Sequence, residues 1–344
     1  METSGLSPLS VVARALVAPG KGILAADESL PTIGRRFAAH GILNEAENRR
    51  AYRELLFTAP ALNEFISGAI LFDETLRQTR GDVPMPELLT RLGIIPGIKV
   101  DAGTVPLANF PDEKITEGLD GLRDRLAAYY ALGARFTKWR AVFAVDGTRP
   151  SAACIAINAG ALARFAALSQ EAGLVPIVEP EILMDGDHSL ARTAELTERI
   201  LRGVFAALAE HRVELEGMLL KPAMVLPGAS SPEQATAAAI AAATLRSLLR
   251  GVPAAVPGIV FLSGGQDAVV ATERLNAICQ PGGAPWTLSF SFGRALQDAA
   301  VQAWRGDPAH VGAAQAALRH RARCNALAVR GGYSVEAESA SASA

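Results

Sequence analysis

The chain has 344 residues, half of them hydrophobic, and its formal net charge is −2 at pH 7. This length allows one large α/β barrel or two ordinary domains, and the composition is sufficient for a large apolar core. The near-neutral charge gives no electrostatic footprint for nucleic acid, and no apolar stretch approaches the length of a membrane span. We therefore expect neither a nucleic-acid partner nor a membrane partner.

The cysteines are few and far apart, which argues against a disulfide framework and favours a reducing compartment: Cys154, Cys279 and Cys324. Residues 1–20 lack the charged head and apolar centre of a signal peptide, so we expect a cytoplasmic protein. The histidines show no metal-ligand spacing, so we expect no zinc site, no other metal and no cofactor: His40, His188, His211, His310 and His320.

Apolar runs with strand character alternate with helical segments along most of the chain. The stretches that hold the expected strands cover residues 22–28, 66–72, 94–100, 135–143, 174–181, 215–224, 258–262 and 286–292. The expected helices cover residues 8–17, 45–58, 119–132, 151–170, 188–210, 231–250, a segment after 294, and 308–328. The start of the helix at 231 is predicted from a serine cap, a proline at the first helical position and a glutamine that completes a capping box.

A charged or polar residue lies near the end of each strand, at intervals of about forty residues through the middle of the chain. These residues are Asp27, Asp73, Lys99, Lys138, Glu179, Lys221, Ser263 and Arg294. Eight βα units at this spacing predict an α/β protein with a closed (β/α)₈ TIM barrel, preceded by an extra N-terminal helix. A helical solenoid can have a similar period, but it does not place polar residues at the ends of β-branched runs.

Domain boundaries follow from the composition of the last residues. The glycine pair at 331–332 is expected to end the regular secondary structure. Residues 334–344 contain Ser, Ala and Glu with a single valine. Such a segment cannot bury enough apolar surface to fold, so we expect a disordered, flexible tail. Residues 1–333 then form a single barrel domain.

Lys221 ends an apolar run and is followed by Pro222. Burial disfavours the ammonium form, and a neutral amine attacks a carbonyl carbon to give a Schiff base. Taken alone, Lys221 is better explained as a lysine that extends from a strand end into solvent. The other charges favour the nucleophile, because the carboxyl ends of barrel strands converge on one mouth, where active sites lie.

Three further residues suit proton transfer at this mouth. The positive charge of Lys138 favours the neutral amine of a neighbouring lysine, or holds a substrate oxygen. Glu179 is expected to be a buried carboxylate with a raised pKa that shuttles protons. Asp27 is placed to take a proton from a substrate hydroxyl as a carbon–carbon bond breaks. An ion-pair network that only stabilises the barrel is the structural alternative, but so many converging charges favour a charged substrate.

Two groups of residues suit the binding of anions. The loop 263–265 offers backbone N–H groups, and Arg294 adds a planar bidentate donor after the last strand. Phosphate sites in such barrels commonly follow the last two strands. A second phosphate could be held by Ser29, Arg35 and Arg36.

The sequence strongly resembles class I, Schiff-base fructose-1,6-bisphosphate aldolases over residues 20 to 330. The matching motifs are GKGILAADES (20–29), ENRR (47–50), GIKVD (97–101), KWR (138–140), VPIVEPEIL (175–183), DGDH (185–188), LLKPAMV (219–225), FLSGGQ (261–266) and GRAL (293–296). The resemblance implies metal-free, reversible cleavage of fructose 1,6-bisphosphate to dihydroxyacetone phosphate and glyceraldehyde 3-phosphate. It further implies a role in glycolysis and gluconeogenesis and a cytosolic homotetramer.

The resemblance also implies roles for particular residues. It gives the Schiff base to Lys221 and proton-transfer or electrostatic roles to Asp27, Lys138 and Glu179. The implied substrate contacts are Lys99, Arg140, Ser263, Gly264, Gly293 and Arg294, with Ser29 and Arg36 at the other phosphate.

The chain departs from the family pattern at several positions. It has Leu30-Pro31 after the aspartate motif, Arg35 for a lysine, Ala223 for an asparagine, Phe292 for a tyrosine, and no C-terminal tyrosine. Two alternatives therefore stay open. One is a transaldolase or a Schiff-base aldolase that prefers another ketose phosphate, and the other is a non-catalytic scaffold with the same fold.

Overall fold

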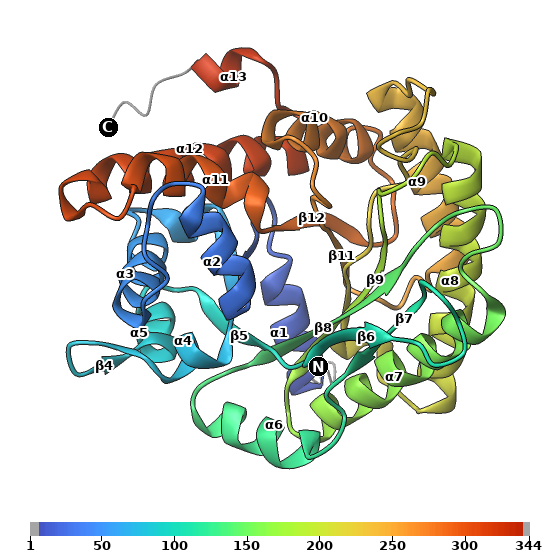
Figure 1. Cartoon of the computed structure of the whole chain (residues 1–344), viewed down its shortest axis with the longest axis horizontal. Helices are drawn as coiled ribbons and strands as arrows, with labels where there is room; N and C mark the ends of the chain where they lie inside the picture. Colours follow the sequence, from blue (N-terminus) through green and yellow to red (C-terminus); the bar gives the residue numbers. More distant parts are fainter. Residues whose placement is uncertain (1–6, 340–344) are drawn as a thin grey trace, which may run out of the picture.

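The computed structural model describes residues 7–339, and its centre is a closed barrel of parallel strands (Figure 1). Around the barrel the strands follow the order β1-β12-β11-β10-β9-β8-β5-β2, so neighbours in the chain are neighbours in the barrel. The strands are β1 (Gly22–Ala26), β2 (Ile66–Leu71), β5 (Ile95–Lys99), β8 (Phe136–Phe143), β9 (Val175–Ile182), β10 (Leu219–Leu220), β11 (Gly258–Phe261) and β12 (Thr287–Phe292). The prediction of a (β/α)₈ barrel is confirmed.

Helices surround the barrel, and two small hairpins extend from its connections (Figure 1). The α-helices are α1 (Pro8–Leu16), α2 (Leu30–Ala38), α3 (Ala46–Phe57), α4 (Asp73–Arg77), α5 (Met85–Arg91), α6 (Leu122–Ala131), α7 (Ala152–Glu171), α8 (Leu190–Glu210), α9 (Ala237–Gly251), α10 (Ala268–Cys279), α11 (Arg294–Trp304), α12 (Val311–Val329) and α13 (Glu336–Ser339). The hairpins pair β3 (Thr79–Arg80) with β4 (Val83–Pro84), and β6 (Gly103–Pro106) with β7 (Lys114–Glu117). Short 3₁₀ turns are η1 (Leu62–Glu64), η2 (Leu215–Gly217) and η3 (Pro308–His310).

Alternation along the strands separates two apolar layers. Every residue of β1 is buried, as expected for a parallel strand covered on both faces. Ile23 and Ala25 belong to the cluster inside the barrel, whereas Leu24 and Ala26 pack in the layer between strands and helices. Side chains of a strand point alternately to its two faces, so a run of apolar residues fills both layers.

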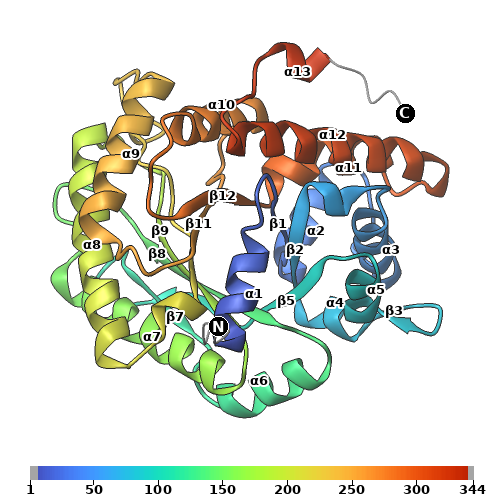
Figure 2. The same cartoon turned by 180° about the vertical axis from the view of Figure 1, so that it is seen from behind.

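Helix α1 packs against the apolar cluster inside the barrel, and Figure 2 shows it across the barrel from behind. Leu16 and Val17 belong to that cluster. A Cβ atom at Gly68 would lie 2.6 Å from the Leu16 side chain, and one at Gly258 would lie 2.6 Å from Val17. Glycine at these strand positions therefore allows the extra N-terminal helix to fit closely against the barrel.

Helix α9 begins later than the capping motif predicts. It starts at Ala237, where Thr236 Oγ1 accepts a hydrogen bond from the N–H of Ala239 at 3.2 Å. Glu233, which lies between the predicted cap residues Ser231 and Gln234, accepts from the N–H of Leu190 at 2.8 Å. The predicted start at 231 is thus wrong: Thr236 is the N-cap, and the segment before it contacts the first turn of α8 through Glu233.

Helix α7 contradicts the expectation that no apolar stretch approaches the length of a membrane span. By length and composition it is long and apolar enough to cross a membrane. Rather more than half of the apolar window is buried, and Leu162 and Phe165 are completely enclosed. A core helix of a large barrel passes the same test of length and composition.

Part of the expected C-terminal tail has structure. Residues Glu336–Ser339 form α13, and the Glu338 carboxylate accepts hydrogen bonds from Tyr333 and Arg321 at 2.6 Å each. Disorder was expected because the segment has little apolar surface to bury. The ion pair between Glu338 and the buried Arg321 gives it structure instead. Residues 340–344 lie outside the described part of the chain.

Candidate active site

One cavity of about 980 Å³ lies at the carboxyl ends of the barrel strands. All twelve residues that the sequence nominated for catalysis or substrate binding line it: Asp27, Ser29, Arg36, Lys99, Lys138, Arg140, Glu179, Lys221, Ser263, Gly264, Gly293 and Arg294. Arg35, also nominated for the second phosphate, lines the same cavity. The strand ends thus bring together residues that are as much as 267 positions apart.

Strand register places Lys221 beside Glu179. Leu220 of β10 pairs with Val178 of β9, and the N–H of Lys221 donates to the Val178 carbonyl at 2.8 Å. The residues that follow each pair, Lys221 and Glu179, are therefore level with each other. On the other side of β9, Glu179 pairs with Arg140 of β8.

Two lysines and two carboxylates form a continuous chain of ion pairs. Lys221 Nζ lies 3.2 Å from Glu179 Oε1, and Lys138 Nζ lies 3.3 Å from Glu179 Oε2. Lys138 Nζ also lies 2.7 Å from Asp27 Oδ2. The side chains of both lysines and of Glu179 are at most 5% exposed. Water screens these charges little, so each protonation state depends strongly on the neighbouring groups.

The net pKa shifts follow from the opposed effects of burial and charge. Burial raises the pKa of Asp27, but the ammonium groups of Lys138 and Lys221 outweigh it and lower that pKa to about 2. Burial lowers the pKa of Lys138, yet the carboxylates of Asp27 and Glu179 raise it overall. Both groups are therefore charged at neutral pH in the free protein.

Glu179 differs from the expectation of a raised pKa. Burial does push its pKa upward, but Lys138, Lys221 and Arg140 together shift the pKa below its ordinary value. The sequence argument considered burial without the cations on the neighbouring strands. In the free protein Glu179 is an ionised proton acceptor between two ammonium groups.

Lys99 and Arg140 are each held by an acidic residue near the end of a barrel strand. Lys99 Nζ donates to the Asp101 carboxylate at 2.5 Å and to the Asp101 carbonyl at 2.8 Å. The guanidinium of Arg140 pairs with Glu181, two residues beyond Glu179 on β9. These acids orient the two cations toward the shared cavity without covering them, since all four residues line it.

The loop after β11 and the start of α11 line one end of the cavity. Gly264 and Gly265 have φ angles of +56° and +85°, which disfavour residues with a Cβ atom. A Cβ at Gly265 would also lie 3.0 Å from Arg294 Nη2. Arg294 is exposed at the first turn of α11, where helix N–H groups favour negative charge. Within residues 7–339, Arg294 makes no ion pair with the protein.

A second cationic end is built around α2. Arg36 pairs with Glu28, and its Nη2 lies 2.8 Å from Asp298 Oδ1. Ser29 Oγ lies 3.1 Å from Thr32 Oγ1, one turn further along α2. Ser29 is the N-cap residue of α2 and its side chain caps no backbone N–H, so the hydroxyl is available to a ligand.

Sequence reasoning missed several residues that hold the nominated ones in place: Glu28, Thr32, Asp101, Glu181 and Asp298. The spacing of Glu179 and Glu181 is a signal for one of them, since residues two apart on a strand face the same side. Asp298 carries no such signal, because it contacts Arg36 across 262 positions of sequence.

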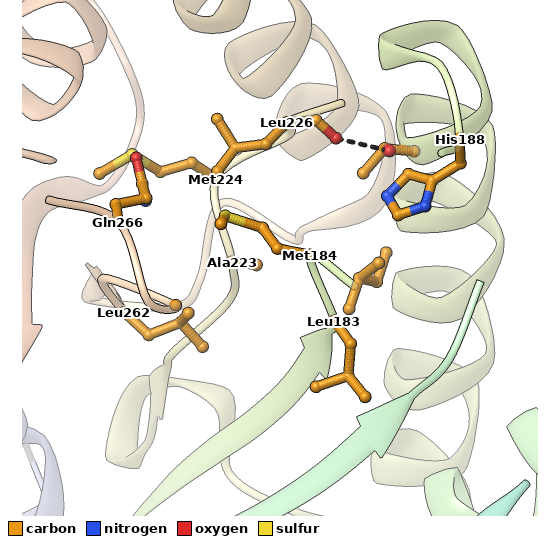
Figure 3. Close-up of a pocket in the computed structure, with 11 residues that line it drawn as sticks. Leu183, Met184, His188, Ala223, Met224, Leu226, Leu262 and Gln266 are labelled. Carbon is orange, nitrogen blue, oxygen red and sulfur yellow. Dashed lines mark hydrogen bonds between the residues drawn. The ribbon is translucent and has the colours of Figure 1, made fainter. Parts of the chain in front are cut away.

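A small second cavity of about 10 Å³ adjoins the loop that follows Lys221 (Figure 3). Ala223, which replaces the family's asparagine, lines it together with Met184, Met224 and Leu262. His188 also lines it, and its buried Nδ1 has no hydrogen-bond partner among the described residues. Burial lowers the pKa of His188. The departure at Ala223 therefore leaves a mainly apolar space, large enough for about one water molecule.

A barrel mouth with a buried lysine–carboxylate chain between two cationic ends defines an enzyme for a substrate that is anionic at both ends. Residues 8–344 match the family model "Fructose-bisphosphate aldolase class-I". The chain therefore belongs to the class I fructose-bisphosphate aldolase family, and it is a fructose-bisphosphate aldolase of glycolysis.

Similar proteins agree with this membership. A "Probable fructose-bisphosphate aldolase class 1" of Xanthomonas axonopodis pv. citri is 55% identical over 95% of this chain and 98% of its own length. The "Fructose-bisphosphate aldolase, cytoplasmic isozyme" of Cicer arietinum is 54% identical over 92% of this chain and 88% of its own length. A solved structure of fructose-bisphosphate aldolase from Plasmodium falciparum, in complex with TRAP and an inhibitor, has a TM-score of 0.94. It is 48% identical, with 95% of both chains covered.

Proposed function

We propose that this aldolase cleaves fructose 1,6-bisphosphate through a Schiff base on Lys221. The observation that carries the proposal is the position of Lys221 Nζ, 3.2 Å from Glu179 Oε1 and almost fully buried. Attack on a ketone needs the neutral amine, and Glu179 lies within reach to take the proton that the amine must lose. Dihydroxyacetone phosphate and glyceraldehyde 3-phosphate are then the products of cleavage.

In the proposed series of reaction steps, each proton that is released has an acceptor among the described groups. The amine of Lys221 adds to the substrate ketone, and the carbinolamine loses its hydroxyl as water with a proton returned by Glu179. Asp27, ionised because its pKa is low, then takes the proton of the C4 hydroxyl. The C3–C4 bond breaks, its electron pair moves to the iminium nitrogen, and the enamine and the aldehyde result. Protonation at C3 and hydrolysis by water release the ketose phosphate and restore Lys221.

The remaining cations bind and orient the substrate in this proposal. Lys138 stabilises the charge that moves between Asp27 and Glu179, since it lies within 3.3 Å of both carboxylates. The loop of Ser263 and Gly264, with Gly293 and Arg294, holds the phosphate nearest the ketone. Ser29 and Arg36 hold the other phosphate, and Lys99 and Arg140 contact the sugar chain between them.

Borohydride trapping tests the Schiff base. Reduction in the presence of dihydroxyacetone phosphate should leave a stable secondary amine on Lys221, located by peptide mass mapping. The protein reduced without substrate is the control and should carry no adduct. Lys138 is the informative competitor, because it is equally buried and lies in the same cavity. An adduct on Lys138, or no adduct at all, contradicts the assignment.

The same proposal covers substrate preference, assembly and location. The second cationic end around Arg36 favours a bisphosphate over fructose 1-phosphate, which a comparison of the two substrates tests. The family resemblance supports a homotetramer, a single barrel domain in each chain and participation in gluconeogenesis. Mass measurement by light scattering tests the tetramer. The cytoplasmic isozyme of Cicer arietinum supports a cytoplasmic location.

A non-catalytic scaffold is the weaker alternative. A scaffold has no use for two lysines that are both less than 5% exposed and share one carboxylate. Burying such a cluster is costly unless its charges have a task.

A further inference from the structure

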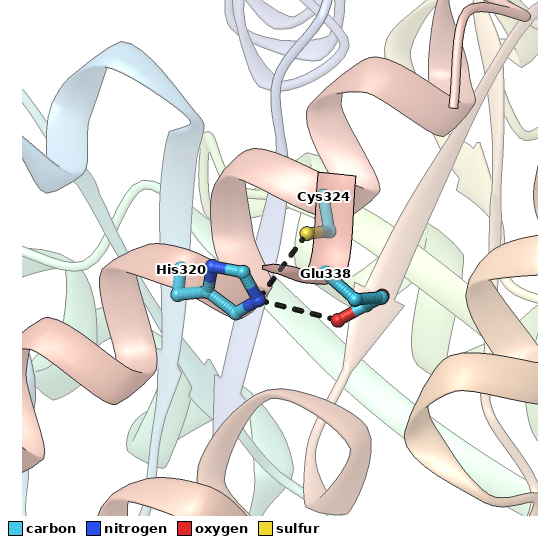
Figure 4. Close-up of side chains that lie close together, drawn as sticks. All are labelled: His320, Cys324 and Glu338. Carbon is cyan, nitrogen blue, oxygen red and sulfur yellow. Dashed lines mark hydrogen bonds and ion pairs between the residues drawn. The ribbon is translucent and has the colours of Figure 1, made fainter. Parts of the chain in front are cut away.

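A histidine, a cysteine and a glutamate meet where the end of the chain returns to α12 (Figure 4). His320 and Cys324 lie one helical turn apart, so their side chains project from the same face of α12. The chain turns back after Gly331, and Glu338 of α13 points toward both of them. The three ligand-type atoms all lie within 4.8 Å of one another. None of the three residues lines the catalytic cavity.

Two of the three separations match those around a tetrahedral metal ion. His320 Nε2 lies 3.2 Å from Glu338 Oε2 and 3.7 Å from Cys324 Sγ. A zinc ion with bonds of about 2.0–2.3 Å at tetrahedral angles keeps such atoms roughly 3.3–3.6 Å apart. Imidazole nitrogen, thiolate sulfur and carboxylate oxygen are the three donor types that zinc takes from proteins. The ligand atoms of Cys324 and Glu338 lie within 4.8 Å of each other, and one ion contacts all three residues when these two atoms close to a similar separation.

The carboxylate of this cluster is held in place by groups behind it. Glu338 Oε1 accepts from Tyr333 and from Arg321 Nη1 at 2.6 Å each, and the same Nη1 also donates to Oε2, the oxygen beside His320. Arg321 is only 5% exposed and donates to the Ala268 carbonyl at 3.0 Å, which anchors it to α10. Partners of this kind orient first ligands in metal sites. A carboxylate has about four acceptor positions, so Arg321 and a metal ion can share Glu338.

We propose that His320, Cys324 and Glu338 bind a zinc ion that ties the C-terminal segment to α12. The ligands bring two negative charges once the thiol has lost its proton, which balances the ion. Three protein ligands leave a fourth position for water. His320 and Glu338 are each 21% exposed, so the ion has a path to the buried thiol between them.

The spacing of the five histidines alone does not indicate this site, because its other two ligands are a cysteine and a glutamate. The four-residue spacing of His320 and Cys324 on a predicted helix was visible, but the third ligand lies fourteen residues beyond Cys324. The site is independent of aldol cleavage, which uses no residue of the cluster. Removing the ion with EDTA is therefore expected to leave cleavage of fructose 1,6-bisphosphate unchanged.

Metal titration of the full-length chain tests the proposal. Metal-free protein is titrated with zinc chloride in competition with a chromophoric chelator, and one ion per chain is expected to bind. Cys324→Ser and Glu338→Gln should each weaken binding at least about tenfold, since each removes a ligand. Cys279→Ser and His310→Gln are matched controls, because they remove a thiol and an imidazole outside the cluster, and they should bind like the wild type.

Cobalt(II) in place of zinc gives a second readout, which begins with the unmodified chain. Cobalt should show a near-ultraviolet band from thiolate-to-metal charge transfer, and Cys324→Ser should abolish it. Circular dichroism and aldol activity verify that each variant is folded. Absence of stoichiometric zinc, a cobalt complex without the thiolate band, or wild-type affinity in folded Glu338→Gln would overturn the proposal.

Discussion

Glu179 Oε1 lies 3.2 Å from the Nζ atom of Lys221, and the side chains of both residues are at most 5% exposed. The contact arises from strand register, since the pairing of Leu220 with Val178 makes the two residues level. In the proposed reaction this carboxylate accepts the proton that Lys221 loses before it attacks the ketone. The same pair therefore accounts for both the burial of the charge and its proposed use.

Replacing Glu179 by glutamine should lower kcat by about 10²–10⁴, the usual contribution of one acid–base group. The amide keeps the shape of the side chain but cannot accept a proton from Lys221. KM should change less, because the proposed phosphate contacts lie elsewhere. Glu181→Gln is the matched control on the same strand: it frees Arg140 and should raise KM more than it lowers kcat. Similar kcat values for Glu179→Gln and wild type would exclude Glu179 from proton transfer.

Replacing Arg294 and Arg36 separately should distinguish the contributions of the two proposed phosphate sites to substrate binding. Arg294→Ala should weaken the binding of fructose 1-phosphate and of the bisphosphate alike, by roughly 1.5–3 kcal/mol for one charge-assisted contact. Arg36→Ala should impair the bisphosphate more, because only that substrate has the second phosphate. Steady-state kinetics with both substrates measures the difference. Arg91→Ala, an exposed arginine outside the cavity, controls for the loss of one positive charge. Equal losses for both substrates in Arg36→Ala would refute the division.

The low pKa of Asp27 predicts an acid-sensitive contribution to stability. Its folded pKa, about 2, is below the ordinary value of 3.8, so the ionised carboxylate stabilises the fold above that value. The contribution is lost as the pH falls toward 2. The stability difference between wild type and Asp27→Asn should thus shrink by roughly 1 kcal/mol from about pH 6 to pH 3. Urea unfolding at both pH values measures it, and a constant difference would contradict the ion pair with Lys138.

The barrel was predictable because each strand is a short apolar run that ends at a polar residue. Lys138 and Glu179 could be assigned to neighbouring strand ends from spacing alone, and both line the cavity. The pKa shifts of these residues could not be predicted from spacing. The pKa of Glu179 is lowered by cations from other strands, and only strand register sets those distances.

Contacts between distant segments account for the features that the sequence did not predict. The carboxylate of Glu233 bonds the first turn of α8, and the helix that follows it starts at Ala237, later than the local motif indicates. Asp298 of α11 reaches Arg36 of α2 in the same manner, since the strands before these helices are neighbours in the barrel. A local sequence pattern indicates which groups can form caps and ion pairs. The tertiary fold determines which partner each group contacts.

Deleting residues 334–344 should change kcat for cleavage by less than about threefold, well below the 1.4 kcal/mol of a tenfold effect. The described part of this segment bonds to α12 through Arg321, and none of its residues lines the catalytic cavity. Stability should fall by about 1.5–3 kcal/mol, because the buried Arg321 loses a charged partner. Glu338→Gln in the full-length chain should reproduce most of that loss and leave kcat unchanged. A tenfold drop in kcat after truncation, without the same drop in Glu338→Gln, would show that the segment acts at the barrel mouth.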